Sequence, residues 1–529
     1  MSQVHEPSTE PVGVSLEEKD LSRDSSAQDL TKEGGAEKDA PQQGPAEATS
    51  KPNDAGDDAL QIVSDQVRWV TEEENKRILQ KIDRHIMPVL FIIYFLQFMD
   101  KTTLSLASVF GIVKDAHLEG DQYSLLGSMP AVAQLVLQPL SAYLLVKFRL
   151  SLYIPCLILG AFETSTQAAF ILVGQMWYRR QEQGIRLAIW FSNVGWVNVV
   201  GSLIMYGFSH VKGGELHSYR LAFLVLGLVT TACGVASFFV FPDNPVKCKF
   251  LTHDEKVIAV ERLRSNQQGL ETKVFKFKQV RETLMDLKSW LWMALMLLYS
   301  IPTAAITVFG PLIVRGFGYE GYEVMLFLIP FGVLQVLFIF LTFWLSNKYR
   351  MKLPLALVLM ALCIVGSVIL FTQGRDKKDQ PALLAAYYLM AASTAIAPTF
   401  LSWQAVNVAG HTKKTTTSAL MIMGNYTGGI VGPLLFASQD GPYYHNGILA
   451  CIISYVCAAI LTCFTGCYLH YLNKRNEVRR VQAGKSAKII DYSMVGFVSQ
   501  GEMESNTQNL NIGKRAFEDL TDLENDEFI

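Results

Sequence analysis

The sequence predicts an all-α integral membrane protein that crosses the bilayer about eleven times. Half of the 529 residues are hydrophobic and only 18% are charged. The mean hydropathy is +0.23, and the apolar residues come in long blocks. This combination is typical of polytopic membrane proteins and unusual for soluble ones.

Each predicted span is an apolar run long enough for a helix to cross a hydrocarbon core ~30 Å thick. The runs are 86–110, 123–146, 152–177, 187–208, 220–241, 290–313, 323–346, 353–372, 381–405, 416–437 and 447–472. The acidic stretch 1–70 is poor in aromatic residues, and we expect a disordered tail there. Thr71 and Glu74 have the spacing of a helix capping box, which predicts an amphipathic helix leading into the first span.

Basic residues indicate how the spans are arranged. A polar connector over 243–289 separates an N-terminal bundle, 71–242, from a C-terminal bundle, 290–473. In the second bundle, most of the Lys and Arg in the loops fall on one side of the membrane, which the positive-inside rule assigns to the cytoplasm. We therefore expect both termini, including a tail over 474–529, to be cytoplasmic.

The first bundle lacks one crossing that this rule requires. Lys147 ends the second span inside, so a single span over 152–177 would carry the basic stretch 178–186 to the outside. Two helices would need about 40 apolar residues, more than this region contains. Either the region is broken or re-entrant, or about one span's worth of residues near 153–160 is missing from the sequence. We favour the second explanation.

Two adjacent charges, Asp100 and Lys101, lie in the first span. Ionisable groups inside a membrane are costly unless they face the interior of a bundle or water, so the pair is a functional candidate. One alternative is that the pair lies at a helix end and extends to the lipid headgroups. Another is a structural ion pair.

Six motifs narrow the class of protein. They are YFLQFMDKTTLSLASVFGI (94–112), FPDNPVKCKFLTHDEK (241–256), TVFGPLIVRGFGY (307–319), SWQAVNVAGHTKKTTTSAL (402–420), GGIVGPLLF (428–436) and DLTDLENDEF (519–528). In order and spacing they resemble the fungal allantoate permease group of the anion:cation symporter family, within the major facilitators.

The resemblance implies the major facilitator fold, with two helical bundles of six-span ancestry. It also implies a secondary active transporter of the plasma membrane. Such a protein imports a small organic anion, such as allantoate or another ureide, a vitamin or another carboxylate, together with a proton by alternating access. We expect a monomer in the lipid bilayer, with no cofactor, no metal and no nucleic-acid partner.

The sequence departs from the family pattern at two places. In the fourth-span motif R-x-x-L-G-x-x-E, Leu159, Gly160 and Glu163 fit, but Cys156 stands at the Arg position. In the eleventh span, the stretch 428–434 lacks the polar Asn and Gln of G-N-I-I-G-P-Q. These departures leave the substrate open. They also keep an alternative open, namely a non-transporting nutrient sensor or a degenerate, truncated transporter.

Proton-coupled transport of an anion needs a group that binds a proton, a positive charge for the substrate and polar groups that discriminate. The candidates for proton coupling are Asp100 and Glu163. The candidates for substrate binding are Lys101, Gln97, Asn193, Trp403, Gln404 and Asn407. Intramembrane amides also serve as contacts between helices. The alternative for Trp403 is that it anchors the helix at the membrane interface. The alternative for Glu163 is a structural role, in which its carboxylate lies between packed helices and pairs with an Arg of a loop.

Other classes of protein are not favoured. The eight cysteines lie mostly in apolar stretches without metal-ligand spacing, so we expect buried apolar side chains rather than disulfides or metal ligands. The sequence contains neither H-E-x-x-H nor G-x-S-x-G, which argues against a membrane enzyme. It also lacks the repeated polar loops of a channel filter.

Overall fold

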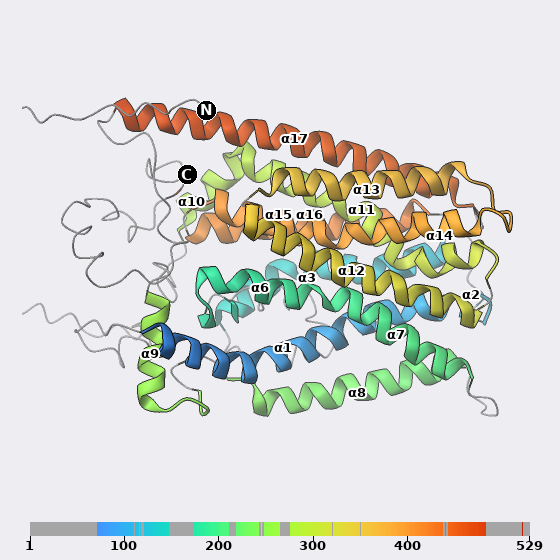
Figure 1. The fold of residues 1–529 in the computed structure, drawn as a ribbon, viewed down its shortest axis with the longest axis horizontal. Helices are drawn as coiled ribbons and strands as arrows, with labels where there is room; N and C mark the ends of the chain where they lie inside the picture. Colours follow the sequence, from blue (N-terminus) through green and yellow to red (C-terminus); the bar gives the residue numbers. More distant parts are fainter. Residues whose placement is uncertain are drawn as a thin grey trace, which may run out of the picture. The chain divides into compact units, whose positions relative to one another are not determined.

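The computed structural model describes residues 71–147, 173–210, 218–264, 276–349, 351–409, 411–436 and 440–482 with short gaps, together with Thr521. Within these ranges the regular structure is helical, and eight helical segments are long and apolar enough to cross a membrane. The long helices are α1 (Glu72–Ser108), α3 (Gln122–Lys147), α6 and α7 (Arg180–Phe191 and Asn193–Ser209), α8 (Ser218–Val240), α11 (Leu287–Gly316), α12 (Gly321–Tyr349), α13 (Leu353–Thr372), α14 to α15 (Gln380–Leu389 and Ile396–Asn407), α16 (His411–Leu434) and α17 (His445–Gln482) (Figure 1).

Helix α1 joins the predicted amphipathic segment and the first span without a break. The Thr71 hydroxyl accepts a hydrogen bond from the Glu74 amide at 3.3 Å, and the Glu74 carboxylate accepts one from the Thr71 amide at 3.1 Å. This confirms the capping box. Ile78, Ile82 and Ile86 recur every four residues on the buried face of the helix. The charges in the middle of the span therefore belong to the same helix as the basic residues at its start.

The predicted span 381–405 is divided into two α-helices by a 3₁₀ segment, η3 (Met390–Ala395). Pro398 has no amide hydrogen to donate to the carbonyl of Thr394, so the α-helical ladder is interrupted at this point. The η3 residues are small or medium-sized and all are buried. The break is therefore accommodated inside the protein, where neighbouring helices can satisfy the freed backbone groups.

Glycines allow α16 to approach α11 closely. Gly424, Gly428 and Gly432 lie one turn apart, and a Cβ atom at any of them would collide with a backbone carbonyl of α11. These carbonyls belong to Met293, Leu297 and Ile301. Lipid supplies no hydrophobic force between helices, so such close backbone packing is a main source of helix association in a membrane.

Helices before and after the connector meet chiefly along three pairs, α1 with α11, α3 with α16, and α7 with α12, and α6 also contacts α12 and α15. We call this contact zone the seam. At the third pair, a Cβ on Gly195 would lie 2.5 Å from the carbonyl oxygen of Gly332, and one on Gly332 would lie 2.6 Å from that of Gly195. The two backbones are therefore in direct contact there.

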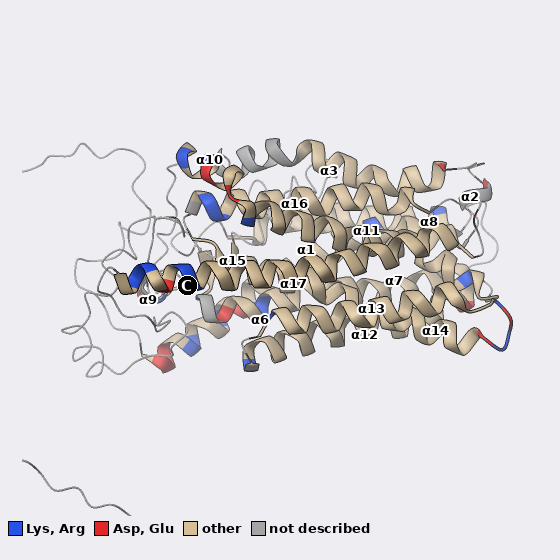
Figure 2. Cartoon of the chain, turned by 90° about the horizontal axis from the view of Figure 1, so that it is seen from above, with Lys and Arg blue, Asp and Glu red and all other residues tan. Residues whose placement is uncertain are grey.

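The connector contains two helices, α9 (His253–Arg264) and α10 (Phe277–Met285). Helix α9 packs on α1, and α10 packs on α16 and α11. Both lie at the same end of the bundle, which we call the α9 face, whereas α2 (Ile112–Asp115) lies at the opposite face (Figure 1). Most Lys, Arg, Asp and Glu residues gather toward the two ends (Figure 2).

The place of the missing crossing, and nearly all of the predicted span 152–177, lie outside the described residues. The flanks of this region are described. Helix α3 starts beside the end of α16, where Ser124 donates to the carbonyl of Phe436, so α3 ends toward the α9 face. Helix α6 starts at that same face, where Arg262 of α9 binds Glu182. The basic stretch 178–186 therefore shares a face with the start of α1, as the charge pattern requires.

The glycine contacts predict an effect on stability. Gly428→Ala should destabilise the fold by about 1–3 kcal/mol, because the new methyl group overpacks the contact with Leu297. Gly227→Ala on α8 is the matched control, since no atom lies within 4 Å of the place that its new methyl group would take. Thermal unfolding of both variants in the same detergent tests this. Equal midpoints would show that the α11–α16 approach does not limit stability.

Candidate functional site

The two adjacent charges of α1 point in different directions. Neighbouring residues of a helix are about 100° apart around its axis. Asp100 is exposed, and its Oδ1 accepts a hydrogen bond from the Thr230 hydroxyl of α8 at 3.3 Å. Lys101 is partly buried one turn before Ser105, whose hydroxyl donates to the Val308 carbonyl of α11 at 2.8 Å. Lys101 therefore lies on the seam side of α1, and Asp100 on the α8 side.

Both charges lie near the middle of the spans. Thr230 is close to the centre of α8, and α1 continues beyond Asp100 as far as Ser108. The alternative of a pair at a helix end that reaches the headgroups is therefore wrong. Charged side chains at mid-depth in a span are expensive to maintain and usually serve a function.

Buried tyrosines surround this part of the seam. Tyr94 of α1, Tyr299 of α11 and Tyr426 of α16 are all buried. The Tyr94 ring also packs edge-on against Trp190 of α6, with centroids 5.0 Å apart. Tyr94 and Lys101 are two turns apart on one face of α1. Sequence reasoning missed this cluster, although the seven-residue spacing of Tyr94 and Lys101 was a usable signal.

Hydrogen bonds join the two halves on the side of the seam away from α9. They run from Ser105 and Tyr123 to the carbonyl of Val308, from Ser124 to the carbonyl of Phe436, from Ser128 to the carbonyl of Ile430, and from Arg315 to the carbonyl of Val109. Their lengths range from 2.6 Å at Ser124 to 3.4 Å at Arg315. The halves are therefore held together at the face opposite α9.

Two amide side chains of α7, one partly buried and one fully buried, have different roles. The Asn198 amide donates to Gln335 Oε1 of α12 at 2.7 Å, which confirms that an intramembrane amide links helices here. Asn193 is fully buried and donates to the carbonyl of Trp190 in its own turn. Among the described residues, its Oδ1 has no hydrogen-bond partner. Asn193 therefore retains an open acceptor inside the protein.

The three candidates on α15 lie toward the α9 face, away from the depth of Lys101. Trp403 is buried and packs edge-on against Trp292 at 5.1 Å, so its alternative as an anchor at the membrane interface is wrong. Asn407 donates to the carbonyl of Trp403 at 2.8 Å. Gln404 is buried, and its Nε2 has no hydrogen-bond partner in the described part of the chain. Gln404 therefore leaves a buried polar atom open among the described residues.

The remaining residues that the sequence analysis singled out include a residue of α1, residues outside the described ranges and the cysteines. Gln97 lies on α1 one turn before Lys101, on the same face. Glu163 and Cys156 lie outside the described residues. The seven described cysteines are free; three of them, Cys457, Cys463 and Cys467, are exposed on α17, so the expectation of burial is wrong for these three.

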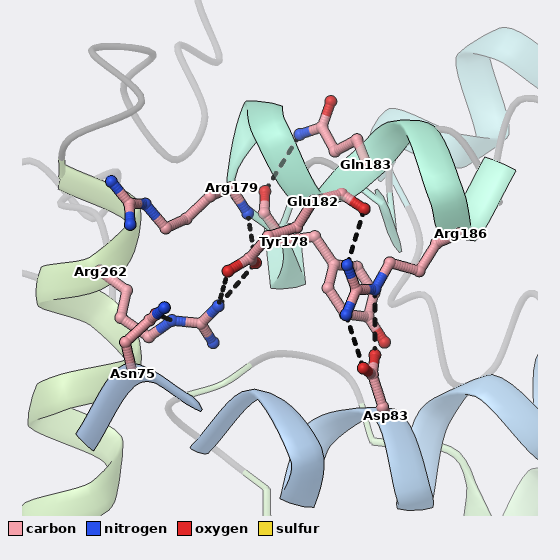
Figure 3. A network of polar contacts seen from close by, with 8 residues as sticks. All are labelled: Asn75, Asp83, Tyr178, Arg179, Glu182, Gln183, Arg186 and Arg262. Carbon is pink, nitrogen blue, oxygen red and sulfur yellow. Dashed lines mark hydrogen bonds and ion pairs between the residues drawn. The ribbon is translucent and has the colours of Figure 1, made fainter. Parts of the chain in front are cut away.

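A polar network joins α1, α6 and α9 at the α9 face (Figure 3). The buried Arg262 guanidinium contacts both Glu182 oxygens, at 2.9 and 2.6 Å, and donates to Asn75. Arg186 binds both oxygens of Asp83 at 3.1 and 2.6 Å. Nearby, the Lys81 ammonium lies 2.7 Å from Glu255 and holds the pKa of that carboxyl below its usual value. The basic residues used to assign topology are therefore also structural.

A second set of lysines holds the C-terminal half at the same face. Lys413 is fully buried and lies 2.9 Å from both Glu282 of α10 and Asp286. It belongs to the first turn of α16. Lys352 and Lys288 donate to the carbonyls of Ser402 and Asn407 near the C-terminal end of α15. Burial lowers the pKa of Lys352 to about 8.

Two sets of membrane-length helices that meet along a seam, with a charge at mid-depth on that seam, define the architecture of a secondary transporter. A family model described as "Major Facilitator Superfamily" matches residues 152–433. The chain belongs to the major facilitator superfamily. The relatives are transporters and not enzymes.

Three relatives confirm the resemblance to allantoate permease-like transporters. An uncharacterized transporter of Schizosaccharomyces pombe is 34% identical over 79% of this chain and 84% of its own length. The thiamine pathway transporter of Saccharomyces cerevisiae is 29% identical over 87% of each chain. The allantoate permease of the same yeast is 28% identical over 90% of each.

Solved structures support the fold. The proton:xylose symporter XylE bound to 6-bromo-6-deoxy-D-glucose has a TM-score of 0.53, with 13% identity. The match covers 75% of this chain and 96% of that one. At this identity the similarity concerns the fold alone.

The Arg262 network predicts a large effect of a single substitution. Arg262→Met should lower stability by about 3 kcal/mol, because Glu182 would keep its charge in a mostly buried position without its strongest partner. Lys81→Met is the matched control, since its more exposed ion pair with Glu255 should contribute only about 0–1 kcal/mol. Thermal midpoints in detergent compare the two. A larger loss for Lys81→Met would contradict the assignment.

Proposed function

We propose that this chain is a proton-coupled transporter that imports a small organic anion across the plasma membrane by alternating access. One observation carries the proposal: Lys101 lies at mid-depth on the side of α1 that faces α11. In a medium of low dielectric constant, a positive charge in the seam attracts an anion strongly. We assign the contact with the substrate carboxylate to Lys101.

The chemistry of the relatives supports the anion as the class of substrate. One relative is an allantoate permease, and allantoate is a carboxylate with two planar ureido groups. The tyrosines that surround the seam offer aromatic faces and hydroxyl groups to such planar groups. We further propose Gln97, Asn193 and Gln404 as polar contacts of the substrate. Trp403 and Asn407 we assign to packing, because they contact Trp292 and their own helix.

The hydrogen bonds away from α9 support alternating access. We infer that the structure represents the state closed at the face opposite α9, with the α9 face and both termini cytoplasmic. To open outward, the bonds of Ser105 and Ser124 must break. The backbone contact of Gly195 with Gly332 lies near the middle of the membrane-length segment Glu182–Ser209 and of α12, and it is suited to act as the pivot.

We assign proton coupling to Asp100, with Glu163 as the second candidate. The Asp100 carboxylate is at mid-depth, and its partner Thr230 belongs to α8. Protonation would remove a charge from the α1–α8 contact and alter how the two helices pack. Asp100 is adjacent to Lys101 in the chain, so its protonation state also changes the electrostatic potential at the anion site.

Substitution of Lys101 tests the anion site. Lys101→Gln should reduce uptake of labelled allantoate at least tenfold, because the attraction for the carboxylate is lost, whereas Lys101→Arg should retain part of the uptake. The control is Lys348→Gln, which removes a cation stacked on Trp344 at the end of α12. Uptake is measured in cells that lack their own permease, over a panel of ureides and vitamin carboxylates.

The outcome also separates transport from sensing. Unchanged uptake by Lys101→Gln would exclude Lys101 from the site. A correctly localised wild-type protein that takes up none of the panel would favour a non-transporting sensor or a degenerate transporter.

Substitution of Asp100 tests proton coupling. Asp100→Asn should abolish accumulation driven by a proton gradient while leaving insertion and exchange of substrate intact, because the amide cannot bind and release the proton. Thr230→Val is the matched control: it removes the 3.3 Å hydrogen bond but keeps the carboxylate. Accumulation is measured in vesicles with and without an uncoupler. Accumulation against a gradient by Asp100→Asn would transfer the role to Glu163.

A further inference from the structure

Helix α10 presents an outward face that is both apolar and positively charged. We propose that this face binds the anionic headgroups and the outer acyl region of the lipid monolayer at the α9 face. The partner is a lipid surface that carries negatively charged phospholipids. This inference does not depend on the substrate or on proton coupling.

The inward face of α10 is attached to the C-terminal half. Gln279 and Thr283 are buried, and Gln279 Oε1 accepts a hydrogen bond from the Lys413 amide at 3.2 Å. The Lys413 ammonium binds Glu282 at 2.9 Å. These contacts set the rotation of α10 about its own axis, so the residues on the opposite side of the helix are held outward.

The acidic and basic side chains of this segment lie on opposite sides of the helix. Its two acidic residues, Glu282 and Asp286, both point inward and bind Lys413. Lys276, Lys278 and Arg281 are exposed. The outward face is therefore positive, and it complements an anionic lipid surface.

Large apolar side chains occupy the same outward face. Phe277 is 75% exposed, Met285 is 71% exposed and Leu284 is 46% exposed. An amphipathic helix with basic and aromatic residues on its free face is typical of helices that lie in the plane of a membrane interface. The combination is costly in water and favourable at the boundary of headgroups and acyl chains.

One hydrogen bond sets the depth of α10 in the membrane. The indole of Trp290, in the first turn of the span α11, donates to the carbonyl of Leu284 at 2.8 Å. Trp290 is itself exposed, as expected of an aromatic residue at a membrane interface. Leu284 and Met285 therefore lie at the level where the span α11 begins, which places lipid beside them.

The test uses the full chain in detergent, titrated with phosphatidylglycerol, with phosphatidylcholine or with inorganic phosphate. Hydrogen exchange of the α10 amides and the thermal midpoint are followed. Phosphatidylglycerol should slow exchange in α10 and raise the midpoint, whereas phosphatidylcholine should do so weakly and phosphate not at all. Equal effects of the two lipids, or an effect of phosphate alone, would overturn the proposal.

Two paired variants complete the test. Lys278→Gln with Arg281→Gln should weaken the apparent affinity for phosphatidylglycerol about 30-fold, from ~1 kcal/mol for each surface cation. Lys377→Gln with Lys378→Gln removes two exposed cations at the opposite face and should leave the affinity unchanged. Phe277→Ser with Met285→Ser should weaken protection by both lipids. The α10 amides could also exchange slowly in detergent without lipid, and equally slowly in all variants. That result would show that another part of the chain covers this face, and it would overturn the proposal.

Discussion

Close approach of helix backbones is the constraint on which the rest of this structure depends. In lipid, burial of apolar surface cannot drive helices together, so packing and hydrogen bonds must do so. Glycines of α16 lie against carbonyls of α11, and Gly195 of α7 meets Gly332 of α12. Hydroxyl groups then reach across to backbone carbonyls, as Ser105 does to Val308. The α11–α16 contacts hold the C-terminal half together, whereas the contacts of Gly195 with Gly332 and of Ser105 with Val308 join the two halves, as the proposed alternating access requires.

The same packing determines where charge can lie. Along α1, the geometry of the helix sends two neighbouring charges to different surroundings, Lys101 to the seam and Asp100 to α8. A carboxylate and an ammonium that pointed together would tend to neutralise each other. Their separation gives the two groups different surroundings although they are adjacent in the chain, as the roles proposed for Lys101 and Asp100 require.

At the α9 face the connector is divided between the halves. Its first helix, α9, is tied to α1 and α6 through Arg262 and Glu182, and its second helix, α10, is tied to α16 through Lys413 and Glu282. Each of these two ion pairs joins residues that are far apart in the sequence. Each of the two described connector helices is therefore attached to one half.

The sequence alone determined the helices, because apolar runs of span length and a Thr71–Glu74 capping box are local patterns. It also located the candidate charges of α1. Only the tertiary structure decided which neighbour each side chain meets. Contacts between distant segments set the direction of Asp100 relative to Lys101 and the burial of the tyrosines from three helices. They also set the packing of Trp403 against Trp292 and the positions of the two connector helices. A single sequence records the spacing of residues along a helix, but the rotation of one helix against another is set by packing.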